Sequence, residues 1–252
     1  MDLGLRDRVY IVSGASRGLG HATAAQLVAE GARVVLCSRE ESRAVAAAQA
    51  LGGPDRVVGV AGDLADPDAA DRLVATALER FGRLDGTVIS VGGPPPGPAA
   101  TVEDDTWRTA FESVFLGPLR LARAVLASGG GQAVTFVLSS SVRSPIPGLA
   151  ISNGLRPGLA MAAKTLADEY GPQGSRVNVV LPGRIDTDRV RELDEAAGDP
   201  VASRTRSEAG IPLGRYGTPE EFGRVTAFVT SPAASYLSGT AVSVDGGATR
   251  VL

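Results

Sequence analysis

Short runs of β-branched and apolar residues alternate with longer segments of helical pattern along the chain. These runs predict seven strands: Val9-Val12, Arg33-Cys37, Val57-Val60, Gly86-Ser90, Ala133-Leu138, Arg176-Leu181 and Ala241-Val244. Several are apolar at every position, so neither face of those strands would meet water. Strands of this kind are typical of a parallel sheet that helices cover on both sides.

The intervening segments predict helices near Gly18-Glu30, Asp68-Phe81, Glu103-Ala127, Ser152-Tyr170 and Pro219-Thr230. Aspartate or threonine opens some of them, and a glycine follows several of their ends, as helix capping favours. The alternation predicts a doubly wound α/β fold of the Rossmann type, with a seven-stranded parallel sheet and helices on both faces. No repeat or linker interrupts the pattern, so we expect a single domain over residues 1–252.

Composition excludes several classes of partner. The net charge of -3 gives no positive field for nucleic acid. Residues 1–8 are charged, and no apolar stretch approaches the about 20 residues that cross a bilayer, so we expect neither export nor a membrane partner. The single cysteine, Cys37, lies in an apolar run and is predicted to pack in the core, which fits a cytoplasmic location. The single histidine, His21, lacks neighbouring ligands and is expected on a helix surface, so no metal is predicted.

A glycine-rich segment, Ser13-Gly20, joins the first predicted strand to the first predicted helix. Its glycines are spaced GxxxGxG. Glycines let the backbone approach a pyrophosphate closely, and a helix N-terminus offers free N–H groups to the anion. This strand–turn–helix context predicts a dinucleotide-binding turn, and a tight turn without a ligand is the alternative.

The second strand ends at Cys37-Ser38-Arg39, where NAD-binding proteins of this fold commonly carry an acid that binds the ribose. No acid stands there. Arg39 and Arg17 would instead bring two guanidinium groups near the adenosine ribose, which favours a 2′-phosphate. The sequence therefore predicts NADP(H) as cofactor, and two solvated surface arginines are the alternative.

Three segments resemble the short-chain dehydrogenase/reductase family. They are the glycine turn, Leu181-Thr187 (similar to the family's PGxxxT segment) and Ser243-Gly247 (similar to its C-terminal strand and turn). The resemblance spans nearly the whole chain and implies an oxidoreductase acting on a small carbonyl or alcohol substrate. The cofactor-binding residues that the motifs imply are Gly14, Ser16, Arg17, Gly18, Leu19, Gly20, Ser38, Arg39, Asp63, Leu64, Ser90, Gly92, Arg156, Pro182, Gly183, Ile185 and Thr187. For Asp63, a family adenine contact, a solvated turn aspartate is the alternative.

The resemblance breaks at the family's catalytic residues, an Asn, a Ser and a Tyr-x-x-x-Lys pair. The single lysine, Lys164, has no tyrosine four residues before it. Matching the helix puts Ser152 at the tyrosine position, Arg156 at the lysine position and Val114 at the asparagine position. A serine hydroxyl is a much weaker acid than a phenol, and arginine supplies charge but does not shuttle a proton.

The family's serine survives within Ser139-Ser140-Ser141, after the fifth strand. Counting back from Ser152 gives Ser139, whereas matching the Ser-Val pair gives Ser141, which we favour; hydroxyls that only satisfy the strand end are the alternative. The predicted catalytic residues are therefore Ser141, Ser139, Ser152 and Arg156. The GGPPPG stretch, expected to be a stiff active-site loop, and the SNxxR helix together resemble a divergent branch of 3-oxoacyl-carrier-protein reductases.

Two further expectations concern the lid and the assembly. The segment Asp188-Gly210 lies at the family's substrate lid and has the pattern of an amphipathic cover, although its many charges favour a solvated helix. Five arginines against seven acids over Arg184-Gly210 do not favour a polyanionic carrier. Small residues on the Ser152-Tyr170 helix are consistent with a homodimer or homotetramer. Two functions lead: an NADP(H)-dependent reductase, or an NADP(H)-binding protein without redox turnover and with a regulatory or structural role. A transferase or hydrolase on the same fold is the remaining alternative.

Overall fold

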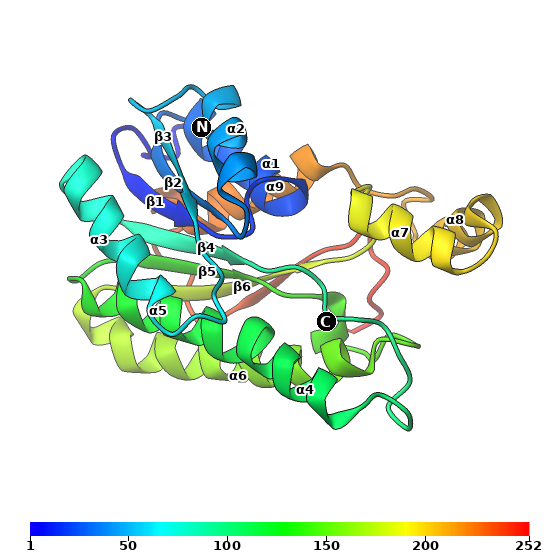
Figure 1. Ribbon diagram of the computed structural model, residues 1–252. Helices are drawn as coiled ribbons and strands as arrows, with labels where there is room; N and C mark the ends of the chain where they lie inside the picture. The colour runs from blue at the N-terminus through cyan, green and yellow to red at the C-terminus, as the bar shows by residue number, and fades with distance from the viewer. Residues whose placement is uncertain (252) are drawn as a thin grey trace.

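The centre of the molecule is one parallel sheet (Figure 1). The computed structural model describes residues 1–251. Its strands are β1 (Val9–Val12), β2 (Arg33–Ser38), β3 (Val57–Ala61), β4 (Gly86–Ser90), β5 (Ala133–Val137), β6 (Arg176–Pro182) and β7 (Ala241–Val244). They lie in the order β3-β2-β1-β4-β5-β6-β7, and every neighbouring pair is parallel. The predicted seven-stranded parallel sheet is confirmed.

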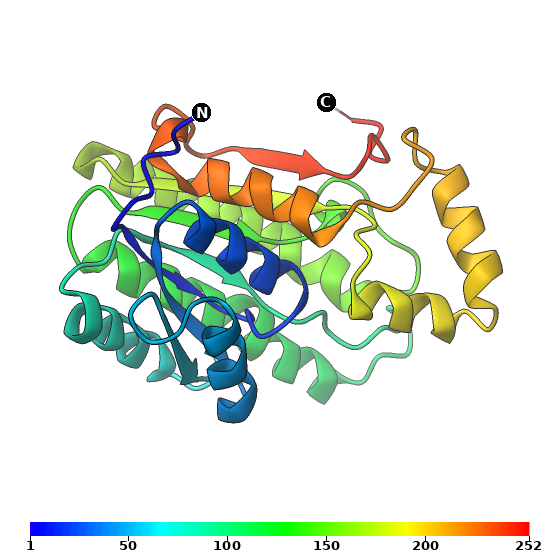
Figure 2. The same cartoon turned by 90° about the horizontal axis from the view of Figure 1, so that it is seen from above.

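Helices cover both faces of the sheet. They are α1 (Gly18–Ala29), α2 (Glu41–Ala50), α3 (Ala69–Phe81), α4 (Asp104–Phe111), α5 (Gly117–Ala127), α6 (Ala150–Tyr170), α7 (Asp188–Ala196), α8 (Pro200–Ala209) and α9 (Pro219–Thr230). One apolar cluster joins the strands to α3, α5 and α6, and the other joins them to α1, α2 and α9. Figure 2 shows α7 and α8 set apart from both layers, beyond one end of the sheet. The doubly wound Rossmann architecture is therefore confirmed. None of the described helices is long and apolar enough to span a bilayer.

The sequence prediction missed three helices as separate elements. The buried residues of α2 are alanines, Ala44, Ala47 and Ala48, whose small side chains give a weak hydrophobic period. The other two missed helices are α7 and α8, which the sequence prediction treated as one lid segment. A short turn separates them, and Pro200 is the first residue of α8.

The predicted helix Glu103-Ala127 is not continuous. A π-helical turn, η1 (Glu112–Leu116), separates α4 from α5. Pro118 follows it and has no N–H to donate to the Val114 carbonyl, so the regular helical ladder cannot continue there. Gly117 packs so closely that a Cβ would lie 2.2 Å from the Leu64 carbonyl oxygen. Val114, at the family's asparagine position, is buried within this turn.

Cys37 is buried in the core, as the sequence predicts. Burial raises the pKa of its thiol to about 12, and the Asp63 carboxylate adds to the rise. Because the thiolate is the reactive form, we expect native protein to resist alkylation by iodoacetamide near neutral pH, and the unfolded chain to react fully. Mass spectrometry measures both. Rapid modification of the native protein would contradict this burial.

Candidate active site

The carboxyl ends of the central strands border a cavity of about 540 Å³. The sheet order reverses between β1 and β4, which is where open α/β sheets bind dinucleotides. Most predicted site residues line the cavity: Gly14, Arg17, Gly18, Leu19, Gly20, Arg39, Ser90, Gly92, Ser139, Ser152, Arg156, Pro182, Gly183, Ile185 and Thr187. The predicted residues outside its lining are Ser16, Ser38, Asp63, Leu64 and Ser141.

The turn between β1 and α1 has the shape and polarity that an anion requires. Gly14 has a φ of +57°, and a Cβ there would lie 2.5 Å from the Ser90 carbonyl oxygen. The Ser13 hydroxyl donates to that same carbonyl and fixes the turn to the end of β4. No side chain of residues 1–251 caps the start of α1, and its first turn holds no acid. Free backbone N–H groups and the helix dipole there favour a phosphate.

Arg17 and Arg39 both line the cavity beside this turn. Arg17 Nη1 lies 3.4 Å from an Asp188 oxygen and 3.8 Å from a Glu192 oxygen, both on α7. All three side chains are about half exposed, so solvent screens these ion pairs and they contribute little stability. A bound phosphate can therefore displace them at small cost.

The predicted cofactor residues outside the cavity have structural contacts. The Ser38 hydroxyl donates to Ser16 Oγ at 3.1 Å and so ties the end of β2 to the glycine turn. Asp63 Oδ1 accepts from the Ala65 N–H at 3.0 Å, as a turn aspartate does, and Leu64 is buried. A contact of Asp63 with adenine stays a prediction.

Two buried serines meet at the carboxyl end of β5. The hydroxyls of Ser141 and Ser152 are hydrogen-bonded at 3.2 Å, although they come from the 3₁₀ turn η2 (Ser140–Val142) and from α6. Ser139 accepts from the Ser141 N–H and opens η2. Ser139 and Ser152 line the cavity, whereas Ser141 lies behind Ser152. The favoured residue, Ser141, therefore reaches the cavity through the Ser152 hydroxyl.

Arg156 is a buried cation one helical turn after Ser152. Its Nη1 donates to the carbonyl oxygens of Val137 at 3.3 Å and Leu138 at 2.9 Å. No carboxylate of the described residues lies within 4.0 Å of its guanidinium. Burial lowers the pKa of Arg156 to about 10, and the like charge of Arg189 adds to the effect. Arg156 is therefore charged at neutral pH.

The SNxxR segment also shapes the neighbouring loop. The Asn153 side chain accepts from the Ile146 N–H at 3.0 Å and donates to the Ile146 carbonyl at 2.9 Å. This pair holds the loop before α6 against the helix, and Ile146 lines the cavity. A Cβ at Gly154 would lie 2.9 Å from the Trp107 ring, so glycine permits the approach of α4.

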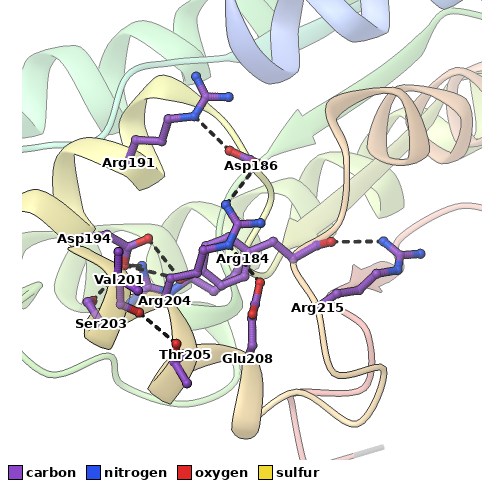
Figure 3. Close-up of polar contacts among 11 residues, drawn as sticks. Arg184, Asp186, Arg191, Asp194, Val201, Ser203, Arg204, Thr205, Glu208 and Arg215 are labelled. Atoms are coloured by element: carbon purple, nitrogen blue, oxygen red, sulfur yellow. Dashed lines mark hydrogen bonds and ion pairs between the residues drawn. The ribbon is translucent and has the colours of Figure 1, made fainter. Parts of the chain in front are cut away.

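A polar network holds the two lid helices together (Figure 3). The buried carboxylate of Asp194 accepts from the Ser203 hydroxyl at 2.9 Å and from the Tyr216 hydroxyl at 3.0 Å. Arg191 and Arg204 both donate to Asp186, at 2.9 and 3.1 Å. Burial raises the pKa of Asp186, but these hydrogen bonds outweigh burial and lower it overall. Most lid arginines thus have acidic partners within the lid.

Arg189 of α7 reaches away from this network to the opposite wall of the cavity. Its Nη2 donates to the Pro94 carbonyl at 3.1 Å, within the GGPPPG loop. A Cβ on Gly93 would lie 3.0 Å from Arg189 Nε, so glycine makes room for the guanidinium. The sequence identified the loop and the lid as separate site elements, but not the residue that joins them.

The fold and this cavity define a protein of the Rossmann class. Residues 14–249 match a family described as enoyl-(acyl carrier protein) reductase. The short-chain reductase protein NovJ of Streptomyces niveus is 37% identical over 96% of this chain and 94% of its own length. A 3-oxoacyl-[acyl-carrier-protein] reductase of Synechocystis sp. is 31% identical over 96% of this chain and 97% of its own.

The structure of L-sorbose reductase from Gluconobacter frateurii, solved with NADPH and L-sorbose, has a TM-score of 0.93 and 31% identity, and all of both chains is covered. The chain belongs to the short-chain dehydrogenase/reductase family, as its motifs predict.

Proposed function

We propose that this protein is an NADP(H)-dependent oxidoreductase that interconverts a carbonyl compound and its alcohol. One observation carries the proposal: Ser152, which is hydrogen-bonded to Ser141, and the buried Arg156 border the same cavity as the glycine turn. The similarity to a sorbose reductase solved with NADPH and to a 3-oxoacyl-[acyl-carrier-protein] reductase supports it.

The residues of the cavity fit NADP(H). The uncapped start of α1 would hold the pyrophosphate, since its N–H groups are free. Arg17 and Arg39 would bind the 2′-phosphate, and Arg156 would donate to ribose oxygens. When bound, NADPH supplies the hydride.

The chain itself supplies a hydrogen-bonded hydroxyl and a positive charge. Ser152 Oγ would donate its proton to the carbonyl oxygen, Ser141, 3.2 Å away, would hold the Ser152 hydroxyl in place, and water in the cavity would return a proton to Ser152. Arg156 would stabilise the negative charge that develops on that oxygen, because its guanidinium is buried and solvent screens its charge only weakly. A serine hydroxyl is a weaker acid than a phenol, and in this arrangement the charge of Arg156 would compensate by stabilising the developing oxyanion.

Cofactor choice tests the roles of the two arginines. We expect NADPH to bind more tightly than NADH, and Arg39→Asp to reverse the preference, because it removes a phosphate donor and adds a like charge. A charge-assisted contact of this kind changes affinity by about 10- to 100-fold. Arg43→Asp, on the exposed side of α2, is a control with the same charge change. Calorimetry that gives equal affinities for both cofactors in the wild type would contradict the assignment.

A second candidate is an NADP(H)-binding protein without redox turnover. Buried Val114 and the absence of a phenol at position 152 favour it, because the family's proton path is altered at both places. Both candidates share the cofactor site and differ only in turnover. For either function we propose a homodimer or homotetramer in the cytoplasm.

A further inference from the structure

The substrate end of the cavity carries an excess of positive charge. Arg156 and Arg189 both line it; Arg156 has no carboxylate partner among residues 1–251, and Arg189 has a single, solvent-exposed ion pair with Glu192. The nearest carboxylate to Arg189 is Glu192, at 3.5 Å, and that residue also lies 3.8 Å from Arg17. All other lid arginines with acidic partners point to Asp186, Asp188, Asp194 or Glu208. Arg189 is thus the lid cation that is directed at the cavity.

The geometry of Arg156 shows that its own hydrogen bonds leave capacity for a ligand. Only Nη1 donates to acceptors among residues 1–251, and both acceptors are neutral backbone carbonyls. Its Nε and Nη2 groups have no acceptor among residues 1–251, and the residue is only 5% exposed. Burial of a cation without a counterion is costly. Ribose hydroxyls would satisfy the N–H groups but would not neutralise the charge.

Arg189 approaches from the lid and is held in place by the loop opposite. Its bond to the Pro94 carbonyl and its fit against Gly93 orient the guanidinium across the cavity. The like charges of Arg189 and Arg156 interact, since Arg189 lowers the pKa of Arg156. An anion between them would relieve this repulsion and gain charge-assisted hydrogen bonds from both.

We propose that the substrate is a small carbonyl compound that carries a carboxylate, and that Arg189 and Arg156 bind this carboxylate. The inference rests on the proposed reductase function, because it assigns the substrate class of the same cavity. Cofactor and substrate share this cavity, which extends from the glycine turn to the lid. Arg189 is then a specificity-determining residue.

The test compares matched charged and uncharged probes. Pyruvate, acetoacetate and levulinate place the carboxylate at increasing distances from the ketone, and their methyl esters lack the charge. Calorimetry on NADP⁺-saturated protein measures binding, and NADPH oxidation measures turnover. We expect at least one acid to bind about ten-fold or more tightly than its ester. Arg189→Gln should remove this preference and leave the NADPH affinity within about two-fold. Arg206→Gln, an exposed lid arginine outside the cavity, should retain it.

The two proposals fail in different ways. If acids bind in an Arg189-dependent manner and nothing is reduced, the anion site stands and the reductase function is wrong. If ketones are reduced but the acids bind and react no better than the esters, the anion site is wrong and the reductase function stands. An acid preference that survives in Arg189→Gln also overturns the assignment, and so does the absence of any acid binding.

Discussion

Replacing Ser152 with alanine should lower kcat for carbonyl reduction by about 10²- to 10⁴-fold, the range that a positioned proton donor contributes. The reason is geometric: Ser152 lines the cavity and its hydroxyl is held by Ser141 at 3.2 Å. The affinity for NADPH should remain, since the residues expected to bind its phosphates are untouched. Steady-state kinetics and calorimetry measure the two effects.

Ser144→Ala is the matched control, because Ser144 is exposed between η2 and α6 and lies outside the cavity lining. It should keep the wild-type kcat. A Ser152→Ala variant that also kept the wild-type kcat would remove Ser152 from the chemistry and leave water near Arg156 as the proton source.

The double change Ser152→Tyr with Arg156→Lys should raise carbonyl reduction, by up to about 10²- to 10⁴-fold if the phenol reaches the carbonyl oxygen. The phenol is a stronger acid than a serine hydroxyl, and the lysine would stand one helical turn further along α6. Position 152 borders the cavity, which gives the ring room. Addition of Val114→Asn tests whether the family's asparagine is also needed.

Ser152→Phe with Arg156→Lys separates acidity from shape. The phenylalanine variant has almost the same bulk as the tyrosine variant and lacks only its hydroxyl, so its rate of carbonyl reduction should stay at or below that of the wild type. Equal rates for the tyrosine and phenylalanine variants would show that the family's proton-transfer geometry is not retained here.

The features that the sequence predicted well depend on local pattern. The apolar runs of the strands reflect burial within a few residues, and they predicted the sheet correctly. The glycine spacing after β1 reflects local backbone conformation, and it predicted the close approach at Gly14. The π-helical turn also had a local signal, Pro118 inside a helical pattern, which the prediction did not use.

The contacts that the sequence could not predict join distant segments. Arg189 meets Pro94 across a separation of 95 residues, and its sequence neighbourhood, like that of the other lid arginines, contains acids and gives no sign of this contact. Ser141 and Ser152 are closer in sequence, but their hydrogen bond depends on how η2 ends against α6. Pattern alone therefore left the choice between Ser139 and Ser141 open.

The small residues of α6, which favoured an interface between two copies of the chain, also have a role within one chain. Gly154 and Gly158 contact the Trp107 and Phe115 rings of this chain, so these small residues already serve its own helix packing. Met161, on α6, is 68% exposed and is available to a second copy. The homo-oligomer stays a prediction, which light scattering against the 25.7 kDa chain mass decides.

The central proposal is that this divergent site performs carbonyl reduction with NADPH. The most direct measurement incubates the wild type with NADPH that carries two deuterium atoms at C4 and a panel of ketones and oxo acids, and analyses the products by mass spectrometry. We predict an alcohol that carries deuterium at the former carbonyl carbon, and loss of this product in Ser152→Ala. Tight NADPH binding with no deuterated alcohol from any member of the panel, in the wild type and in the Val114→Asn, Ser152→Tyr, Arg156→Lys triple variant alike, would contradict the reductase function.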